Sequence, residues 1–519
     1  MSVVATPWDA YRLRANPFFQ DELGGPSDPG AERLRELFVG REAERRLLGR
    51  LLLADEAARA LVVGDPGVGK SSFVNRVKRD LTEAQFERGA RSDIARSIAD
   101  DAEGRDGAGP IEAPFITHAP AIEVQSAWSA LDFTAEVLKV TLRMVRSATA
   151  QAVDAGASEG TGSDGPRAPW WTSTSAGLRS VLRSATGTTD AWARVEQLVE
   201  GRMLRSLQVQ GGVPIAQAGI GMQASWAPPI VSPASLVEVA VDAIALARRQ
   251  TGRRLLFHVN NLENLSPADL PAAAQLLRDV RALFTAPGAS WIFVGTSDVE
   301  QPLFRTAPQL SGFVPQAVHL APLPPDALGA LLERRYRYLQ RGAAPPIPPV
   351  AREDAVTLYG AYLGDLRNFL RLLSDAALRG LDLHGGRSLS AGDVIALMGP
   401  QHLRAMERAL SPANWRHFLR TVLGENPGDT VLAKFRHTDV KQRCGVKDPT
   451  ANRLMTELER GGWIVFDRQA GVSVYYRLSG AAAIGFASLV AARGEDAAPL
   501  LAAVTDDRDD GRRRARGPR

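Results

Sequence analysis

The chain has 519 residues, of which 45% are hydrophobic and 23% charged, so a mainly disordered or fibrous protein is excluded and several domains are expected. Its single cysteine, Cys444, excludes an internal disulfide and a cysteine-based zinc site. The net charge is only +4, no apolar run is long enough to span a membrane, and the first residues do not resemble a signal peptide, so we expect a soluble, cytoplasmic protein without a membrane partner.

The order of the predicted elements indicates an α/β core. Residues 1–35 read as an irregular lead-in, and apolar strands then alternate with amphipathic helices from residue 36 to 324. The predicted strands are 60–64, 120–125, 254–260, 290–295 and 316–323, and the predicted helices are about 41–58, 70–82, 129–147, 234–250 and 267–285. Two segments, about 88–113 and 149–232, are expected to be insertions. Alternation of this kind predicts a parallel sheet covered on both faces.

Three further regions follow this core. Residues 325–400 are helical throughout in pattern, and residues 411–480 read as three short helices and a β-hairpin, which is typical of a winged helix. The charged tail, 492–519, is predicted to be disordered.

A glycine-rich turn between the first predicted strand and its helix carries the strongest chemical signal. Its sequence GDPGVGKS, residues 64–71, fits the pattern GxxxxGK[ST] in the required place after a strand and before a helix. The glycines let backbone N–H groups turn toward phosphate oxygens, Lys70 reaches the β- and γ-phosphates, and the Ser71 hydroxyl ligates Mg²⁺. The sequence therefore predicts binding of a nucleoside triphosphate and Mg²⁺ by Gly64, Asp65, Pro66, Gly67, Val68, Gly69, Lys70, Ser71 and Ser72.

Hydrolysis is a separate question, because it needs a carboxylate at the end of a second apolar strand. The strand at 254–260 instead ends in Asn260 and Asn261, whose amides carry no charge and cannot act as a base, although they can contact the nucleotide site. Glu263 can substitute if the following loop curls back, so slow hydrolysis and none at all both stay open. His258, in the middle of the strand, is interpreted as a buried, hydrogen-bonded residue and not as a catalyst.

These motifs resemble the Orc/Cdc6 branch of the AAA+ ATPases. The sequence FVGRE at 38–42 precedes the glycine-rich turn, FVGTS at 293–297 ends a strand, and GDLRNFLRLLSDAAL spans 364–378. The resemblance implies an α/β P-loop NTPase fold with an AAA+ RecA-like core, an all-α lid at 325–400 and a C-terminal winged helix-turn-helix. The family has Asp-Glu where this chain has Asn260 and Asn261, and this departure bears on turnover but not on nucleotide binding.

The same resemblance implies roles for residues outside the glycine-rich turn. It implies an adenine pocket at Val39, Gly40 and Arg41. Thr296 or Ser297 would lie near the γ-phosphate, and Arg367 would reach the nucleotide from the lid. Arg305 is the candidate for an arginine finger that acts on a neighbouring subunit.

The predicted winged helix carries the local excess of positive charge. Residues 411–478 hold 11 Lys or Arg against 7 Asp or Glu, which favours a polyanionic partner. Thr438 is expected to cap its second helix and Asp448 its third, whose apolar side faces inward. The residues expected to contact double-stranded DNA are Lys447, Thr450, Asn452, Arg453 and Thr456 on the outward face of the third helix, and Arg468 at the tip of the hairpin. Docking of a protein on this module is the alternative.

The sequence thus supports the hypothesis of an ATP-binding protein whose winged helix binds DNA and whose nucleotide state controls self-association or recruitment of a partner protein. One rival is an adaptor or transcriptional regulator that binds ATP without hydrolysing it, which the two asparagines favour. Another is a signalling NTPase of the STAND type, in which the winged helix packs on protein and does not contact DNA.

Overall fold

The structure is a computed structural model of the chain. It describes residues 6–25, 31–82, 115–118, 120–125, 128–157, 233–262, 270–300, 304, 313–314, 316–426, 429–470 and 473–505. The predicted insertion at 88–113 lies outside these residues, and so does the insertion at 149–232 except for its first nine residues, which continue a helix.

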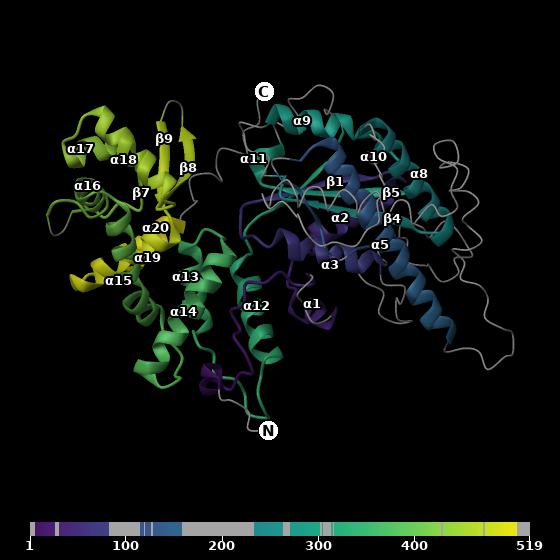
Figure 1. Ribbon diagram of the computed structural model, residues 1–519. Coiled ribbons are helices and arrows are strands. Elements are labelled where there is room, and N and C mark those ends of the chain that lie inside the picture. Colours follow the sequence, from purple (N-terminus) through teal and green to yellow (C-terminus); the bar gives the residue numbers. More distant parts are fainter. Residues whose placement is uncertain are drawn as a thin grey trace, which may run out of the picture.

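A parallel sheet forms the centre of the core (Figure 1). Its strands are β1 (Arg59–Gly64), β2 (Phe115–Thr117), β3 (Ile122–Glu123), β4 (Arg254–Asn260), β5 (Ala289–Gly295) and β6 (Ala317–Leu320). They run in the order β2-β4-β5-β1-β6, with β3 also paired to β4, and every pairing is parallel. The predicted parallel α/β sheet is confirmed, while the strand predicted at 120–125 is shorter and β2 precedes it.

Helices cover both faces of the sheet because alternate side chains of each strand point to opposite faces. On one face Val62 of β1 packs with α2 (Glu42–Ala54) and α3 (Lys70–Thr82). On the other face Leu61 packs with residues of α5, α8, α9 and α10, around Trp291, which stacks on Phe257 with ring centroids 4.3 Å apart. The bounds of these helices are α5 Ala130–Ala157, α8 Pro233–Thr251, α9 Leu270–Asp279 and α10 Arg281–Phe284, and the short α11 (Ser297–Glu300) follows β5.

A helical lid lies between the sheet and the C-terminal unit (Figure 1). It consists of α12 (Pro325–Tyr338), α13 (Arg352–Ala361), α14 (Leu366–His384) and α15 (Ala391–Ala409). The lead-in is more ordered than the sequence predicted. It contains a 3-10 helix at Pro7–Tyr11 and α1 (Ala31–Leu37), because Trp8, Tyr11 and Phe18 are buried in the core of the lid.

The C-terminal unit has the element order of a winged helix. Its elements are α16 (Pro412–Leu423), β7 (Lys434–Arg436), α17 (His437–Cys444), α18 (Asp448–Arg460), β8 (Ile464–Ala470) and β9 (Ser473–Leu478), and its antiparallel sheet has the order β7-β9-β8. The sequence missed β7 and misplaced two caps by a residue or two. Arg436 caps α17 in place of Thr438, because its N–H donates to Asp439 (2.7 Å), and Lys447 caps α18 in place of Asp448.

Two further helices correct the predicted end of the chain. The apolar α19 (Gly480–Ala492) precedes α20 (Ala498–Thr505), which lies inside the segment predicted to be disordered. Leu500, Leu501 and Val504 of α20 are buried, so apolar burial outweighs the charge of the flanking residues. None of the described helices is both long enough and apolar enough to cross a membrane.

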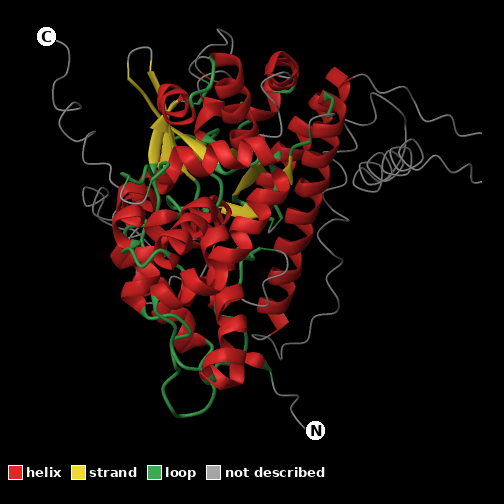
Figure 2. Cartoon of the chain, turned by 90° about the vertical axis from the view of Figure 1, so that its left-hand side faces the viewer, coloured by secondary structure: helices red, strands yellow, loops and turns green. Residues whose placement is uncertain are grey.

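The lid and the winged helix share a single hydrophobic core. The ring of Phe486 in α19 meets the ring of Phe418 in α16 edge to face, with centroids 5.0 Å apart, and buried residues of all four lid helices belong to the same cluster. Figure 2 turns this end of the molecule toward the viewer and shows that it consists mostly of helices. The C-terminal unit therefore shares its core with the lid and is not a separately packed domain.

Candidate nucleotide-binding site

The glycine-rich turn has the backbone that phosphate binding requires. β1 ends at Gly64, the turn follows, and α3 begins at Lys70. Gly67 has φ +80° and Gly69 has φ +94°, conformations that favour glycine and that allow the chain to present N–H groups at the start of α3. The Lys70 ammonium donates to the carbonyl oxygens of Gly64 (2.8 Å) and Asp65 (3.2 Å).

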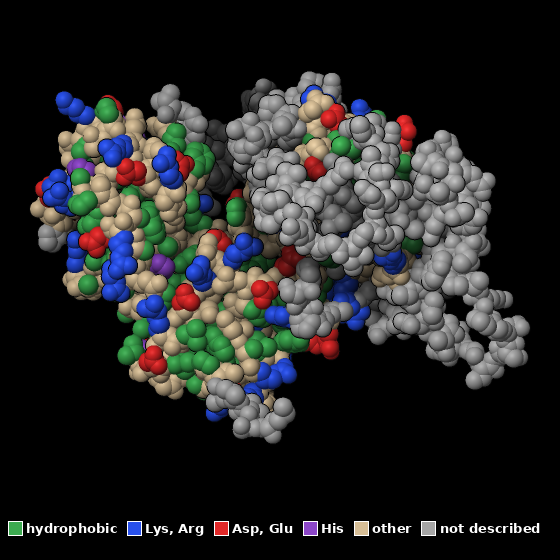
Figure 3. Space-filling view, viewed as in Figure 1, with side chains coloured by type: hydrophobic (Ala, Val, Ile, Leu, Met, Phe, Trp, Pro, Cys, Tyr) green, Lys and Arg blue, Asp and Glu red, His purple; other side chains and the backbone are tan. Residues whose placement is uncertain are grey.

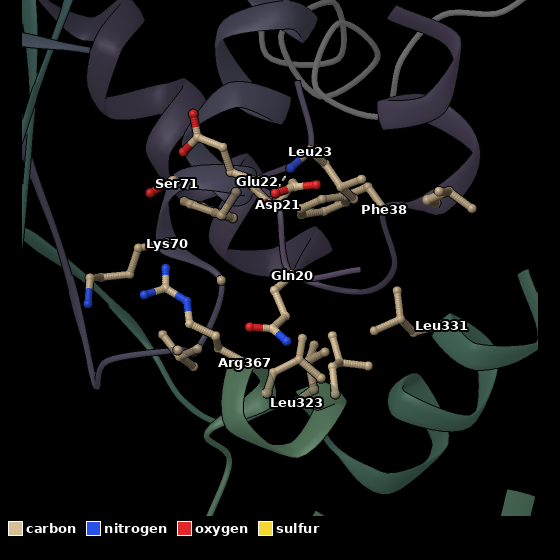
Figure 4. Close-up of a pocket in the computed structure, with 18 of the residues that line it drawn as sticks. Gln20, Asp21, Glu22, Leu23, Phe38, Lys70, Ser71, Leu323, Leu331 and Arg367 are labelled. Carbon is tan, nitrogen blue, oxygen red and sulfur yellow. Dashed lines mark hydrogen bonds between the residues drawn. The ribbon is translucent and has the colours of Figure 1, made fainter. Parts of the chain in front are cut away.

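The turn opens onto a pocket whose walls come from three parts of the chain. The core contributes the turn and the end of β4, the lid contributes α12 and α14, and the lead-in contributes the segment 19–23. Figure 4 shows Arg367 reaching from the lid toward Lys70. The lining residues that the sequence predicted are Val39, Arg41, Pro66, Gly67, Val68, Gly69, Lys70, Ser71, Ser72, Asn260, Asn261 and Arg367.

The other residues that the sequence predicted for this site do not line the pocket or lie outside the described residues. Gly40 (φ +71°), Gly64 and Asp65 lie next to lining residues but are not themselves in the wall. Thr296 and Ser297 lie at the end of β5, where Thr296 is half-buried and Ser297 is exposed, and neither lines this pocket. Glu263 and Arg305 lie outside the described residues.

The lid contacts the phosphate turn directly. A Cβ atom added at Gly67 would overlap the carboxylate of Asp365 and would lie 3.5 Å from the backbone nitrogen of Arg367. Asp365 is the N-cap of α14 and accepts a hydrogen bond from the N–H of Asn368 (3.1 Å). The start of α14 is thus seated on the turn, which brings Arg367 to the pocket.

The sequence missed the part that the lead-in plays. Arg335 of α12 is buried and donates to the carbonyl oxygens of Pro17 (3.0 Å) and Phe19 (2.9 Å), and burial lowers its pKa to about 9. The N–H of Leu23 donates to Ser72 Oγ (3.0 Å), beside the magnesium ligand predicted at Ser71. The segment therefore joins the lid to α3.

Arg41 is held at the edge of the same pocket. Its guanidinium lies 3.5 Å from the Glu44 carboxylate and 3.5 Å from the carbonyl oxygen of Val68, and burial lowers its pKa. The residue has φ +69° at the start of α2, so the backbone turns sharply there. Arg41 therefore lines the pocket, and its implied contact with adenine stays a prediction.

The end of β4 presents its two amides to a carboxylate that the sequence did not single out. Asn260 Nδ2 lies 3.2 and 3.4 Å from the two carboxylate oxygens of Glu123, and Asn261 Nδ2 donates to Glu123 Oε2. The Ser71 hydroxyl and the amide oxygens are hard donors of the kind that Mg²⁺ accepts, so the residues present fit this ion. No sequence motif marks Glu123, because its strand is only two residues long and its partner is 137 positions away.

Behind the turn, His258 is buried as predicted, with 5% of its surface exposed. Within the described part of the chain neither ring nitrogen has a hydrogen-bond partner, so the predicted hydrogen bond is not found. Burial lowers the pKa of His258 well below its usual value, and burial also lowers the pKa of Lys78 to about 8. In both groups burial disfavours the charged form.

The outward face of α18 is open to solvent. Lys447, Thr450, Asn452, Arg453 and Thr456 are all exposed, whereas the inward-facing Ala451, Leu454, Met455 and Leu458 are buried as predicted. Arg453 pairs with Glu457 (3.1 Å), and Lys441 pairs with Asp448 (2.8 Å). Arg468 lies within β8 opposite Tyr475 and not at the tip of the hairpin. In Figure 3 blue Lys and Arg side chains are spread over this lobe, with red Asp and Glu between them.

The strand order, the phosphate turn and the helical lid define a parallel α/β fold of the P-loop type with an all-α lid, which agrees with the fold class that the sequence predicted. The lid and the start of α14 close one side of its pocket. No family model and no curated protein matches this sequence.

Several solved structures are similar to this chain over most of its length. The Aeropyrum pernix ORC1 protein in complex with DNA is 12% identical, with a TM-score of 0.39, and the match covers 91% of this chain and 96% of that one. The Aeropyrum pernix ORC2 protein in ADPNP–ADP complexes is 13% identical, with a TM-score of 0.37, and covers 95% and 97%. Cdc6p from Pyrobaculum aerophilum is 11% identical, with a TM-score of 0.35, and covers 93% and 96%. All TM-scores are below 0.5, so the fold assignment rests on the elements of this chain.

Proposed function

We propose that this protein binds ATP and Mg²⁺ between its core and its lid, that its winged helix binds double-stranded DNA, and that nucleotide occupancy controls self-association or recruitment of a partner protein. The observation that carries the proposal is the pocket in which the phosphate turn, the lead-in and Arg367 of the lid converge. A ligand that contacts three parts of a chain favours the arrangement in which all three contacts are made.

Each residue in the pocket has a role that its chemistry supports. The N–H groups at the start of α3 and the Lys70 ammonium would bind phosphate oxygens, and the Ser71 hydroxyl would hold the metal. Ser71 would thereby hold Mg²⁺ beside the phosphates, where the ion would supply positive charge against them. Arg367, which is exposed to the pocket, would contact the γ-phosphate and so report from the lid whether a third phosphate is present.

The shared core supports transmission from the nucleotide to the winged helix. Because Phe486 and Phe418 pack together and the lid helices belong to the same cluster, a change in the angle of the lid would carry α18 with it. ATP would thereby change how the DNA-binding face is presented to DNA or to a neighbouring subunit. Arg305, as the arginine finger that the resemblance implies, would act on such a neighbour.

Nucleotide binding is tested with Lys70→Ala. We expect at least a tenfold loss of affinity for a fluorescent ATP analogue in an anisotropy titration, because charged hydrogen bonds contribute about 1.5–3 kcal/mol each. Lys139→Ala is the matched control, since Lys139 lies on α5 and pairs with Glu136 (2.9 Å). Unchanged affinity in the Lys70 variant would show that ATP does not bind at this turn.

DNA binding is supported by the exposure and the positive excess of the winged helix, and it is tested by gel shift over a salt series. Replacing both Lys447 and Arg453 with Ala should weaken binding and reduce the slope of log K against log salt by about 0.9 for each phosphate that the variant no longer neutralises. Arg387→Ala is the control, because Arg387 is exposed beside Asp393 in the lid. If the double variant binds DNA as well as the wild type does, the α18 face is not the DNA-binding surface.

A non-hydrolysing adaptor is the second candidate, and the amides at the end of β4 favour it. Steady-state release of phosphate, measured with and without DNA, separates the two: the adaptor predicts nucleotide binding without turnover in either condition. Chromatographic sizing with and without ATP tests the proposed self-association. The STAND-type alternative predicts a covered α18 face, whereas the described residues of that face are exposed.

A further inference from the structure

The two amides at the end of β4 are oriented by a carboxylate from another strand. β3 runs parallel to β4 with Glu123 opposite Asn260, and the N–H of Val124 donates to the carbonyl oxygen of Asn260 (3.2 Å). This pairing holds the Glu123 side chain at the point where β4 ends. Its carboxylate is bonded to the amide nitrogens of Asn260 and Asn261.

The backbone of Asn261 strengthens this arrangement. Its φ is +60°, which is uncommon for a residue other than glycine, and this turn brings the second amide back toward the same carboxylate. Asn260 has only 9% of its surface exposed, so the bond to Glu123 restricts which way its amide can face. Since an amide donates only through nitrogen, the amide oxygens are the atoms that can accept a hydrogen bond or ligate a cation.

Asn260 and Asn261 line the same pocket as Lys70 and Ser71. A negative charge one hydrogen bond behind them raises the electron density at the amide oxygens and lowers the electrostatic potential in the pocket. A carboxylate on β4 would serve a similar purpose, but β4 carries none at its end. Asp21 and Glu22 of the lead-in also line the pocket, and Glu123 of β3 is the carboxylate that bonds the amides at the end of β4.

We propose that Glu123 supplies negative charge to the β4 side of the magnesium site, and that it is a positioning residue which acts through the amides of Asn260 and Asn261. The inference rests on the proposed binding of ATP and Mg²⁺, and it specifies how a site with two asparagines retains the metal. It predicts that ATP binds more tightly with Mg²⁺ than without it, and that this difference in affinity depends on a residue outside the phosphate turn.

The test compares the affinity for ATP in excess Mg²⁺ with the affinity in EDTA, by isothermal titration of the full chain. The wild type should bind more tightly with Mg²⁺. Glu123→Gln should lose about tenfold or more of this gain, because a charge-assisted bond is replaced by a neutral one, while its affinity in EDTA stays the same or rises. Glu123→Asp keeps the charge and should keep most of the gain.

A variant that carries the negative charge on β4 in place of β3 gives the decisive test. The double substitution Glu123→Gln with Asn260→Asp should restore the Mg²⁺ dependence that Glu123→Gln loses, which a loss of folding cannot explain. Glu136→Gln on the surface of α5 is the control and should bind as the wild type does. A Glu123→Gln variant with the full Mg²⁺ gain, or a double variant without restoration, would overturn the inference.

The two proposals fail in distinguishable ways. If the wild type binds ATP equally well with Mg²⁺ and with EDTA, the role of Glu123 is refuted while nucleotide binding stands. If the wild type binds ATP in neither condition, the proposed function is refuted, and the inference about Glu123 falls with it.

Discussion

Replacing Phe486 with Ala tests whether the lid and the winged helix form one body. The Phe486 ring is fully buried in α19, at 5.0 Å from the ring of Phe418 with an interplanar angle of 85°, and 6.3 Å from the ring of Trp415. Removing a buried Phe ring costs about 3–5 kcal/mol, of which the edge-to-face pair contributes about 0.5–1.5 kcal/mol. We therefore expect α16 of the winged helix and α14 and α15 of the lid to be destabilised together.

Hydrogen exchange resolves this effect by region. A loss of about 3–5 kcal/mol should lower amide protection in α14, α15 and α16 alike, by about a hundredfold or more. Leu383→Ala is the control, because Leu383 of α14 is 68% exposed and its truncation should change protection little. If protection falls in α16 while α14 and α15 keep theirs, the two parts unfold separately and the proposed transmission from lid to winged helix is wrong.

Three further predictions concern the pocket and the sheet behind it. Gly67→Ala should weaken ATP binding more than backbone strain alone explains. Gly342→Ala is the control for backbone strain alone, because Gly342 also has positive φ (+76°) but no atom lies within 4 Å of an added Cβ. If the two substitutions change the affinity for ATP equally, the contact between the phosphate turn and the lid does not contribute to binding. His258→Leu should reduce the loss of stability on acidification. Burial lowers the pKa of His258 in the folded chain, so below pH 6.5 the unfolded chain binds a proton that the folded chain does not. This group therefore lowers the free energy of unfolding of the wild type by up to about 1.4 kcal/mol per pH unit. Urea unfolding at pH 7 and pH 5.5 measures this, and parallel curves for variant and wild type would contradict it. Arg335→Met should release the segment 17–23 and speed its cleavage in limited proteolysis, whereas an unchanged cleavage rate would mean that other contacts hold the segment.

Local chemistry explains what could be predicted from the sequence alone. The phosphate turn, β1 and α3 are adjacent in the chain, so glycine placement, an apolar strand and a helical pattern identify them without knowledge of the fold. The parallel sheet follows from alternating strands and helices, and the inward face of α18 follows from the spacing of its apolar residues. Each of these can be read from the pattern within single elements or from the order of elements along the chain.

Contacts between distant residues could not be predicted in this way. Glu123 meets Asn260 only because β3 pairs with β4, and the carboxylate of Asp365 excludes a side chain at Gly67 only because the lid is seated on the phosphate turn. The lead-in forms a wall of the pocket because Arg335 and Ser72 bind its backbone, and α19 joins the winged helix to the lid through Phe486. In each case the contact joins residues far apart in the sequence, and it depends on burial and hydrogen bonds that exist only once the chain has folded.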